Sequence, residues 1–299
     1  MTGKGFRFGS RTEEVNRKVM EERSDDYNPG NNSDYDKNNS GHAQNQNGYG
    51  MLVVYGRDLY AWKPGKRLIR ILGKRMGTIY GIGNLGLCDD QVYHINHEGV
   101  FNLFDGSRIG EGEHYGRLYT HDGELYYTHG SDIIEASSGS NVFKHGLKTD
   151  RSSVPYCVHG MTTHKGEFLC TSEKGIFNVF SGKKLMGSDE FQDLISFDGD
   201  LFYSCYSNIF KTPDNTISVN VATNRGRVFM CAHKGVLYDG SNNRIYQTIS
   251  DPAGATPIIT FPEDPREPLT IRSMISVPEK IFKTVLDIKD SDSWVNNYG

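Results

Sequence analysis

One pattern recurs six times along the chain, in the stretches GRDLYAW (56–62), DDQVYHI (89–95), DGELYYT (122–128), KGEFLCT (165–171), DGDLFYS (198–204) and RGRVFMC (225–231). Each stretch begins with a turn signal and continues as an apolar and aromatic run, which is the composition of a β-strand. With the second turn residue as the anchor, the successive steps measure 33, 33, 43, 33 and 27 residues. A step of this size is typical of a repeat architecture in which each repeat is one supersecondary unit.

A second turn follows each anchor at a nearly constant distance. The distance is 16 residues in five of the units, for example from Gly123 to Gly139, and 14 residues from Gly226 to Gly240. An Asp-Gly or Lys-Gly pair at the first turn favours a type I′ hairpin, because both central residues need positive φ. Each unit therefore predicts two strands joined by a tight turn, a short loop, a third strand, and a second turn that opens a fourth strand.

Four antiparallel strands in about 33 residues resemble a blade of the β-propeller superfamily, from about residue 51 to residue 250 and beyond. A single blade leaves both faces of its sheet apolar, so the blades must pack against one another in a closed ring. The chain lacks the G-H…W-D, kelch and repeated Tyr-Trp-Thr-Asp signatures of particular propeller families. The resemblance therefore implies architecture only, because propellers host enzymes, lectins and scaffolds alike.

The number of blades depends on residues 251–299, which hold six of the ten prolines of the chain and no anchor glycine in register. Three runs in this segment have the composition of strands, at 257–261, 269–275 and 281–286. They predict either a degenerate seventh blade that closes the ring or a cap on a six-bladed ring. Three strands are nearly a blade, so the prediction is an all-β propeller with six clear repeats and a degenerate seventh.

Residues 1–50 are predicted to form an arm ahead of the propeller, which spans residues 51–299. The sequence from Ser10 to Glu13 fits a capping box and predicts a short helix over about 11–23. Residues 24–50 contain no Val, Ile, Leu, Met, Phe, Trp or Cys. Such a segment has little to bury against the entropy of ordering it, so a disordered linker is expected there.

The first eleven residues of the arm combine positive charge with aromatic rings and contain no acid. The residues concerned are Lys4, Phe6, Arg7, Phe8 and Arg11. They predict a peptide that docks on an acidic partner, with a solvated terminus as the alternative.

Composition and cysteine usage exclude several classes of protein. The 33 basic and 37 acidic residues give a net charge of -4, so the overall charge lacks the excess of basic residues that is typical of nucleic-acid-binding proteins. No stretch approaches the roughly 18 apolar residues that a membrane-spanning helix needs. The amino terminus lacks the apolar core of a secretory signal, and the 5 cysteines have no metal-ligand spacing. We expect buried free thiols and a cytoplasmic protein.

Candidate binding residues lie seven positions past the anchors, or six in the case of His129, at the expected tips of the turns between second and third strands. They are His97, His129, Glu173, Tyr206 and His233. Imidazole and carboxylate groups on one face would suit a divalent metal or acid–base chemistry, whereas isolated loop tips would simply be solvated. The chain has no HExxH, His-x-His or nucleophile-elbow motif, so no cofactor is predicted and the question of a metal stays open.

Two further groups of residues stand out. A second ring, two residues before the anchors, is expected to end the first strands at the opposite mouth: Tyr55, Cys88, His121, His164, Phe197 and Asn224. The first unit is markedly basic: Lys63, Lys66, Arg67, Arg70, Lys74 and Arg75. Such a basic cluster either binds RNA, phosphate or an acidic protein, or blunts an edge strand against aggregation.

These observations favour a non-catalytic interaction module that binds another protein through a propeller face and the N-terminal arm. The absence of a catalytic motif and the abundance of tyrosine, a residue enriched at interfaces, support this reading. The alternative is a small-molecule or glycan site at the mouth of the central channel, including a metal-assisted enzyme. Nucleic-acid binding through the basic first unit is a third and weaker hypothesis.

Overall fold

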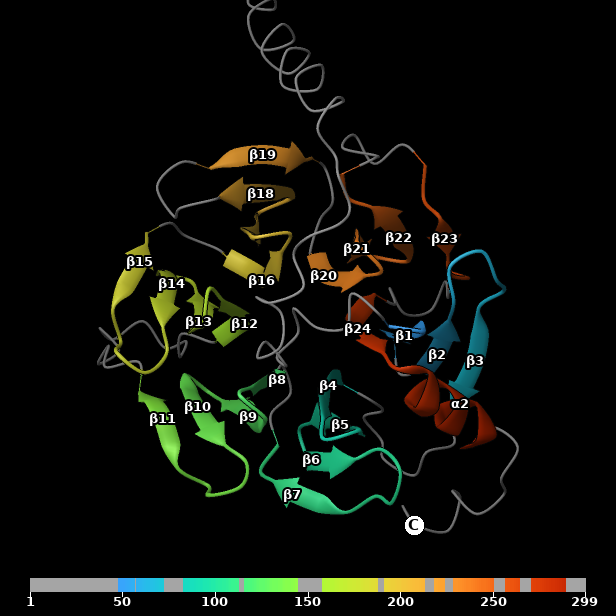
Figure 1. The fold of residues 1–299 in the computed structure, drawn as a ribbon, viewed down its shortest axis with the longest axis horizontal. Helices are drawn as coiled ribbons and strands as arrows, with labels where there is room; N and C mark the ends of the chain where they lie inside the picture. Colours follow the sequence, from blue (N-terminus) through green and yellow to red (C-terminus); the bar gives the residue numbers. More distant parts are fainter. Residues whose placement is uncertain are drawn as a thin grey trace, which may run out of the picture. The chain divides into compact units, whose positions relative to one another are not determined.

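The computed structural model describes residues 48–56, 58–72, 83–112, 116–144, 158–187, 191–212, 218–223, 228–249, 256–263 and 270–288. All of them lie in Asn39–Gly299, the second of the two units into which the chain divides. They form six sheets of four strands, arranged as blades around one axis (Figure 1). The predicted helix over about 11–23, the linker up to residue 47 and the peptide from Lys4 to Arg11 lie outside the described residues.

The blades are numbered I to VI, with the strands of each given from the axis outward. Blades I and II consist of β24 (Ile271–Val277), β1 (Gly50–Tyr55), β2 (Asp58–Trp62) and β3 (Ile69–Leu72), then β4 (Asn84–Cys88), β5 (Gln91–Asn96), β6 (Gly99–Asn102) and β7 (Arg108–Gly110). Blades III and IV consist of β8 (Leu118–His121), β9 (Glu124–His129), β10 (Asp132–Glu135) and β11 (Asn141–Lys144), then β12 (Val158–His164), β13 (Glu167–Ser172), β14 (Gly175–Asn178) and β15 (Lys184–Met186). Blades V and VI consist of β16 (Phe191–Phe197), β17 (Asp200–Cys205), β18 (Asn208–Thr212) and β19 (Val219–Ala222), then β20 (Val228–His233), β21 (Val236–Ser241), β22 (Arg244–Gln247) and β23 (Ile259–Thr260).

The C-terminal strand closes the ring. Each innermost strand contacts the innermost strands of the two neighbouring blades, and β24 contacts both β20 and β4. β24 also pairs antiparallel with β1, with Gly50 opposite Val277 and Leu52 opposite Ile275. The two ends of the described region therefore share blade I, and the contact of β24 with β20 closes the ring between blades VI and I.

The prediction of a degenerate seventh blade is wrong, because the described residues past 250 complete existing blades. Residues 257–261 contribute β23 to blade VI, and the run at 269–275 becomes β24 of blade I. The run at 281–286 lies in the helix α2 (Glu279–Ile288). Ile281, Phe282 and Val285 recur at helical spacing and pack into the core of blade I. No helix in the described residues is long and apolar enough to cross a membrane.

The tight turns of blades II to V confirm the predicted repeat. The two-residue turn of blade III has φ of 48° at Asp122 and 83° at Gly123, and that of blade IV has 51° at Lys165 and 79° at Gly166. Positive φ at both positions is the type I′ geometry, which matches the right-handed twist of the strands that it joins. The second turn, at Gly139 in blade III, joins the third and fourth strands as expected.

The first and last units were predicted out of phase. The hairpin between Tyr55 and Asp58 joins β1 and β2, which are the second and third strands of blade I, because β24 supplies the first. In blade VI residues 228–231 belong to the innermost strand β20, and the type I′ turn is Lys234–Gly235. Gly240 lies within β21 rather than in a turn.

The ring has two faces, which the turns define. Face A carries the turns between first and second strands and between third and fourth strands. Face B carries the turns between second and third strands and the links between blades. The core lies between neighbouring blades: Leu52 and Val54 of blade I pack with Leu85 and Val92 of blade II in one buried cluster. Each blade thus completes the core of the next.

Candidate functional site

The central channel is lined by two rings of residues from the six innermost strands. The first ring consists of the residues four positions before the end of each strand: Asn84, Arg117, Gly160, Asp193, Phe229 and Ser273. The second ring consists of the residues three positions before the end: Leu85, Leu118, Met161, Leu194, Met230 and Met274. The cavity that they enclose measures about 40 Å³. That is room for about three waters and too small for a sugar or a drug-sized ligand.

Polar side chains of the first ring join neighbouring blades. Asp193 Oδ2 accepts a hydrogen bond of 2.6 Å from the backbone N–H of Met230, in the next blade. Asn84 Oδ1 accepts one of 2.9 Å from Leu118 N–H, and Ser273 Oγ accepts one of 3.0 Å from Leu85 N–H. These side chains are committed to holding the ring together, because each satisfies a backbone donor that the neighbouring innermost strand presents.

Arg117 crosses the channel. Its guanidinium carbon lies 4.5 Å from the ring centroid of Phe229, a cation–π distance. Arg117 belongs to blade III and Phe229 to blade VI, which are opposite each other in a six-bladed ring. Arg117 is 7% exposed. The channel is therefore closed near face B by an arginine, and below that by the leucine and methionine ring.

At face A, histidines at the ends of innermost strands bond to hydroxyl groups of the next blade. His121 Nδ1 lies 2.8 Å from Thr163 Oγ1, and His164 Nδ1 lies 2.9 Å from Ser196 Oγ. Burial lowers the pKa of both imidazoles. Neutral imidazole can donate or accept at Nδ1, so each pair forms without a charge. These histidines hold adjacent blades together.

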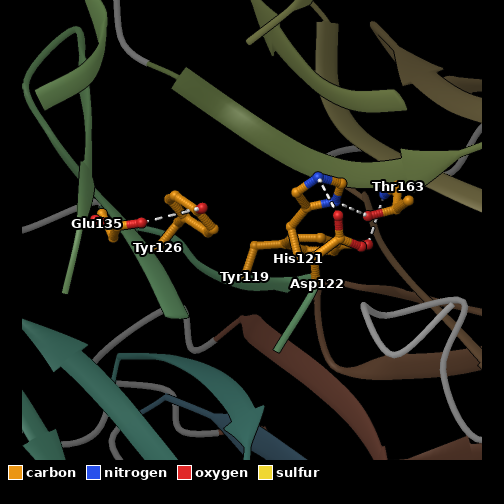
Figure 2. Close-up of polar contacts among 6 residues, drawn as sticks. All are labelled: Tyr119, His121, Asp122, Tyr126, Glu135 and Thr163. Atoms are coloured by element: carbon orange, nitrogen blue, oxygen red, sulfur yellow. Dashed lines mark hydrogen bonds and ion pairs between the residues drawn. The ribbon is translucent and has the colours of Figure 1, made fainter. Parts of the chain in front are cut away.

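Figure 2 shows the His121 pair with its surroundings. The backbone N–H of Thr163 donates to the Tyr119 hydroxyl at 2.6 Å, and His121 Nε2 lies 3.4 Å from Asp122 Oδ2. Burial raises the pKa of Tyr119 to about 12, so this phenol stays protonated. The contact network joins blades III and IV at two levels and leaves neither nitrogen of His121 positioned for a metal.

Four of the predicted binding residues lie in or beside the turns of face B, as the spacing predicted. His97 and Tyr206 lie in the turns after β5 and β17. His129 ends β9, and its Nε2 lies 3.9 Å from Glu111 Oε2. Glu173 Oε1 lies 3.9 Å from His159 Nε2. The structure thus pairs His129 and Glu173 with two residues that the spacing did not predict, rather than with each other.

The predicted position of His233 at a turn tip of face B is wrong. His233 ends β20 at face A and is fully buried. Its Nδ1 lies 2.9 Å from Ser276 Oγ, and burial lowers its pKa to about 4. The error follows from the phase of the last unit, since the true turn glycine of blade VI is Gly235 rather than Gly226. His233 is the third member of the histidine–hydroxyl series.

The second predicted ring is right for blades II to V, where Cys88, His121, His164 and Phe197 end the innermost strands. Tyr55 instead ends the second strand of blade I, and Asn224 lies outside the described residues. Among the residues that the structure describes, no three His, Cys, Asp or Glu side chains gather closely enough to hold a metal ion. Cys88, Cys170, Cys205 and Cys231 are buried free thiols, as expected.

Sequence reasoning missed the channel residues, although their signal was present. Asn84, Arg117, Gly160 and Asp193 each lie six residues before the turn anchor of their blade. The same count from Gly235 reaches Phe229. Counting six residues back from the turn glycine or aspartate therefore identifies a channel-lining residue in five blades. Ser273 of β24 cannot be found in this way, because no such turn follows β24.

A groove of about 430 Å³ lies between blades I and VI on face A. It is lined by the connection between β2 and β3 and by residues of β21, β22 and β23, including Trp62, Lys66, Tyr238 and Ile258. Its volume falls within the range of sites that hold small ligands or anchoring side chains. It is about ten times larger than the channel cavity.

Comparison with known proteins finds similarity of fold at low sequence identity. No protein-family model matches the sequence, and no curated protein sequence matches it. A chain in the crystal structure of the nidogen/laminin complex superposes with a TM-score of 0.55 and 13% identity, covering 76% of this chain and 97% of that one. The PQQ-bound aldose sugar dehydrogenase of Streptomyces coelicolor gives 0.47 and 11%, covering 75% and 91%. The putative glucose dehydrogenase of Thermus thermophilus gives 0.44 and 15%, covering 65% and 88%.

These similarities concern the fold alone, because the identities are all low. The six four-stranded sheets, together with the superposition at a TM-score of 0.55, confirm the predicted β-propeller fold. The chain folds as a β-propeller of six blades, closed by its C-terminal strand.

Proposed function

We propose that this propeller is a non-catalytic module that binds another protein through face A. The observation that carries the proposal is a set of large apolar side chains left in solvent on that face. Phe180, Ile249 and Ile258 are 56%, 55% and 43% exposed. All three lie in connections between third and fourth strands. They belong to blades IV and VI and make up three of the six large apolar side chains that are exposed among the described residues, and exposed apolar surface is typical of a surface that a partner covers.

The small volume of the channel cavity and the hydrogen bonds of its polar groups favour binding at a face over chemistry in the channel. The cavity of about 40 Å³ leaves no space for a substrate. The polar groups that line it are engaged in bonds between blades, as with Asp193 and Met230. The alternative, a small molecule or glycan at the channel mouth, has correspondingly less support.

The N-terminal peptide is the second contact of the proposed module. Its positive charge and aromatic rings suit an acidic surface of the same partner. The peptide comprises Lys4, Phe6, Arg7, Phe8 and Arg11. Two linked contacts bind more tightly than either one, because the second binding step becomes intramolecular.

The experiment compares four baits in an extract of the source organism. They are the full chain, a face A variant (Phe180→Ser), a control variant on face B (Tyr206→Ser), and a chain lacking residues 1–11. The control is matched, because Tyr206 is 54% exposed and Phe180 is 56% exposed. Quantitative mass spectrometry measures each co-purified protein.

We expect a partner that the full chain and the control variant both retain and that the face A variant loses. Removal of residues 1–11 should reduce recovery of the same partner. If no protein distinguishes the face A variant from the control variant, binding through face A is refuted. Loss with the control variant alone would place the interface on the other surface.

A further inference from the structure

The groove between blades I and VI is lined by polar and apolar surface in about equal parts, and two aromatic rings form part of the apolar lining. Trp62 and Tyr238 meet edge to face, with ring centroids 5.6 Å apart and an interplanar angle of 88°. Both rings are buried, at 5% and 7% exposure, and both line the groove. Leu68, Ile258 and Ile259 also line it. An apolar side chain that contacts this apolar part of the lining would leave water for a carbon surface.

One rim of the groove is a fixed turn. The backbone N–H of Lys66 donates to the carbonyl of Lys63 at 2.9 Å, which closes the turn Lys63–Pro64–Gly65–Lys66. Gly65 has φ of 76°, and proline precedes it. Proline followed by a residue of positive φ is the pattern of a type II turn. The turn therefore holds the backbone of Lys66 at the edge of the groove, where Lys66 is a lining residue.

The rim carries positive charge that no acidic side chain among the described residues pairs with. Lys66 and Arg67 are exposed, and within the described part of the chain neither forms an ion pair. Their neighbours differ: Arg70 lies 2.7 Å from Asp58, and the ammonium of Lys63 lies 3.5 Å from the Tyr49 ring centroid. None of the lining residues is acidic. The charged side chains at this rim, Lys66 and Arg67, are therefore both positive.

The groove is continuous with the surface that we propose binds a partner. Ile258 lines the groove and is also one of the three exposed apolar residues of face A. Binding energy at protein interfaces concentrates where a side chain fills a pocket, and charges at its rim steer and orient the partner. A pocket of 430 Å³ beside a basic turn therefore selects a partner with an apolar anchor and carboxylates next to it.

We propose that this groove binds an acidic segment of a partner protein, with an apolar side chain on Trp62 and Tyr238 and carboxylates facing Lys66 and Arg67. The inference rests on the proposed function and specifies the chemistry of the partner. It also assigns a role to part of the basic first unit, since Lys66 lines the groove and the exposed Arg67 follows it in the chain. Arg70, paired with Asp58, supports the structure of the blade instead.

The test uses two synthetic hexapeptides as probes, each with a central Phe-Leu pair. One carries two acidic residues on either side of the pair, and the other carries two basic residues in the same places. Isoleucine methyl groups of the full chain are labelled with 13C and followed by NMR during titration. Ile258 and Ile259 report on the groove, and Ile109 on β7 is a distant, partly exposed reference.

We expect the acidic peptide to shift the methyl signals of Ile258 and Ile259 while Ile109 stays in place. The basic peptide should bind much more weakly. Lys66→Glu should weaken binding of the acidic peptide about fivefold, since one exposed charge pair contributes at about that scale. Lys183→Glu, which makes the same change of charge on an exposed lysine of blade IV, should leave binding unchanged.

Equal binding of the two peptides, or unshifted signals at Ile258 and Ile259, would overturn the inference. A spectrum of Lys66→Glu that differs from wild type only near residue 66 verifies that the variant is folded. The result is separable from the proposed function. A partner that face A variants lose and Lys66→Glu retains would remove the acidic segment while leaving the interaction module in place.

Discussion

Replacement of His94 by leucine should stabilise the ring and make it less sensitive to acid. His94 lies in β5, is 2% exposed and stacks on Phe101 with ring centroids 5.5 Å apart. Neither ring nitrogen has a hydrogen-bond partner among the described residues. An unsatisfied buried polar group costs about 1–3 kcal/mol. His94→Leu, with a side chain of similar volume, should therefore raise the free energy of unfolding at pH 7 by about 1 kcal/mol.

The dependence on pH follows from the pKa of the same group. Burial lowers the pKa of His94 from 6.5 to about 4. Between these values the unfolded chain binds a proton that the folded chain does not, so stability is full above pH 6.5 and falls as the pH drops toward 4. The loss from this one group is about 2 kcal/mol at pH 5. His94→Leu should remove that loss, while His233, lowered to about 4 as well, keeps its own.

Urea unfolding followed by circular dichroism at pH 7 and pH 5 gives the two free energies for each protein. The drop between the two pH values should be smaller in His94→Leu than in wild type by about 2 kcal/mol. Phe101→Leu is the matched control, because it removes the stacking partner and leaves the titrating group. A drop of equal size in wild type and His94→Leu would refute the reasoning, since it would mean that His94 is satisfied or hydrated in the folded ring.

Three further predictions concern the closure of the ring, the bonds between blades and a buried thiol. A Cβ at Gly50 would overlap the Phe282 ring, so Gly50→Ala should lower the free energy of unfolding by about 1–3 kcal/mol, and Phe282→Leu in the same chain should restore part of it. Thr163→Val removes the hydroxyl that pairs with His121 and should cost about 1–2 kcal/mol in urea unfolding; no loss would mean that the pair contributes nothing. Burial raises the pKa of the Cys170 thiol, so mass spectrometry should find Cys170 modified by iodoacetamide only after the ring unfolds, and labelling at the same rate in native protein would contradict its burial.

Local sequence was sufficient to predict the turns and the blades of the middle of the chain. A two-residue turn with φ positive at both positions accepts few residue pairs, and Asp122–Gly123 and Lys165–Gly166 adopt that geometry. Because the side chains of a strand alternate and the turn sets the register, the turn also determines which residues of the adjoining strands face one another. The positions of His97 and Glu173 at turns of face B followed from the same count.

The candidate site was less predictable, because its contacts join residues of different blades. His121 meets Thr163, and Arg117 reaches Phe229 across the ring. Spacing within one repeat carries no information about the partner that a neighbouring blade supplies. The groove between blades I and VI likewise combines a turn near the start of the chain with strands near its end.

The repeating unit, a four-stranded blade, follows from local sequence, because hairpin turns and strand alternation are properties of neighbouring residues. The number of blades and the phase of the first and last depend on contacts between distant parts of the chain. The hairpin between β1 and β2 looks like the first hairpin of any other blade until β24 pairs with β1. That pairing joins residues more than two hundred positions apart, so no pattern among neighbouring residues reveals it.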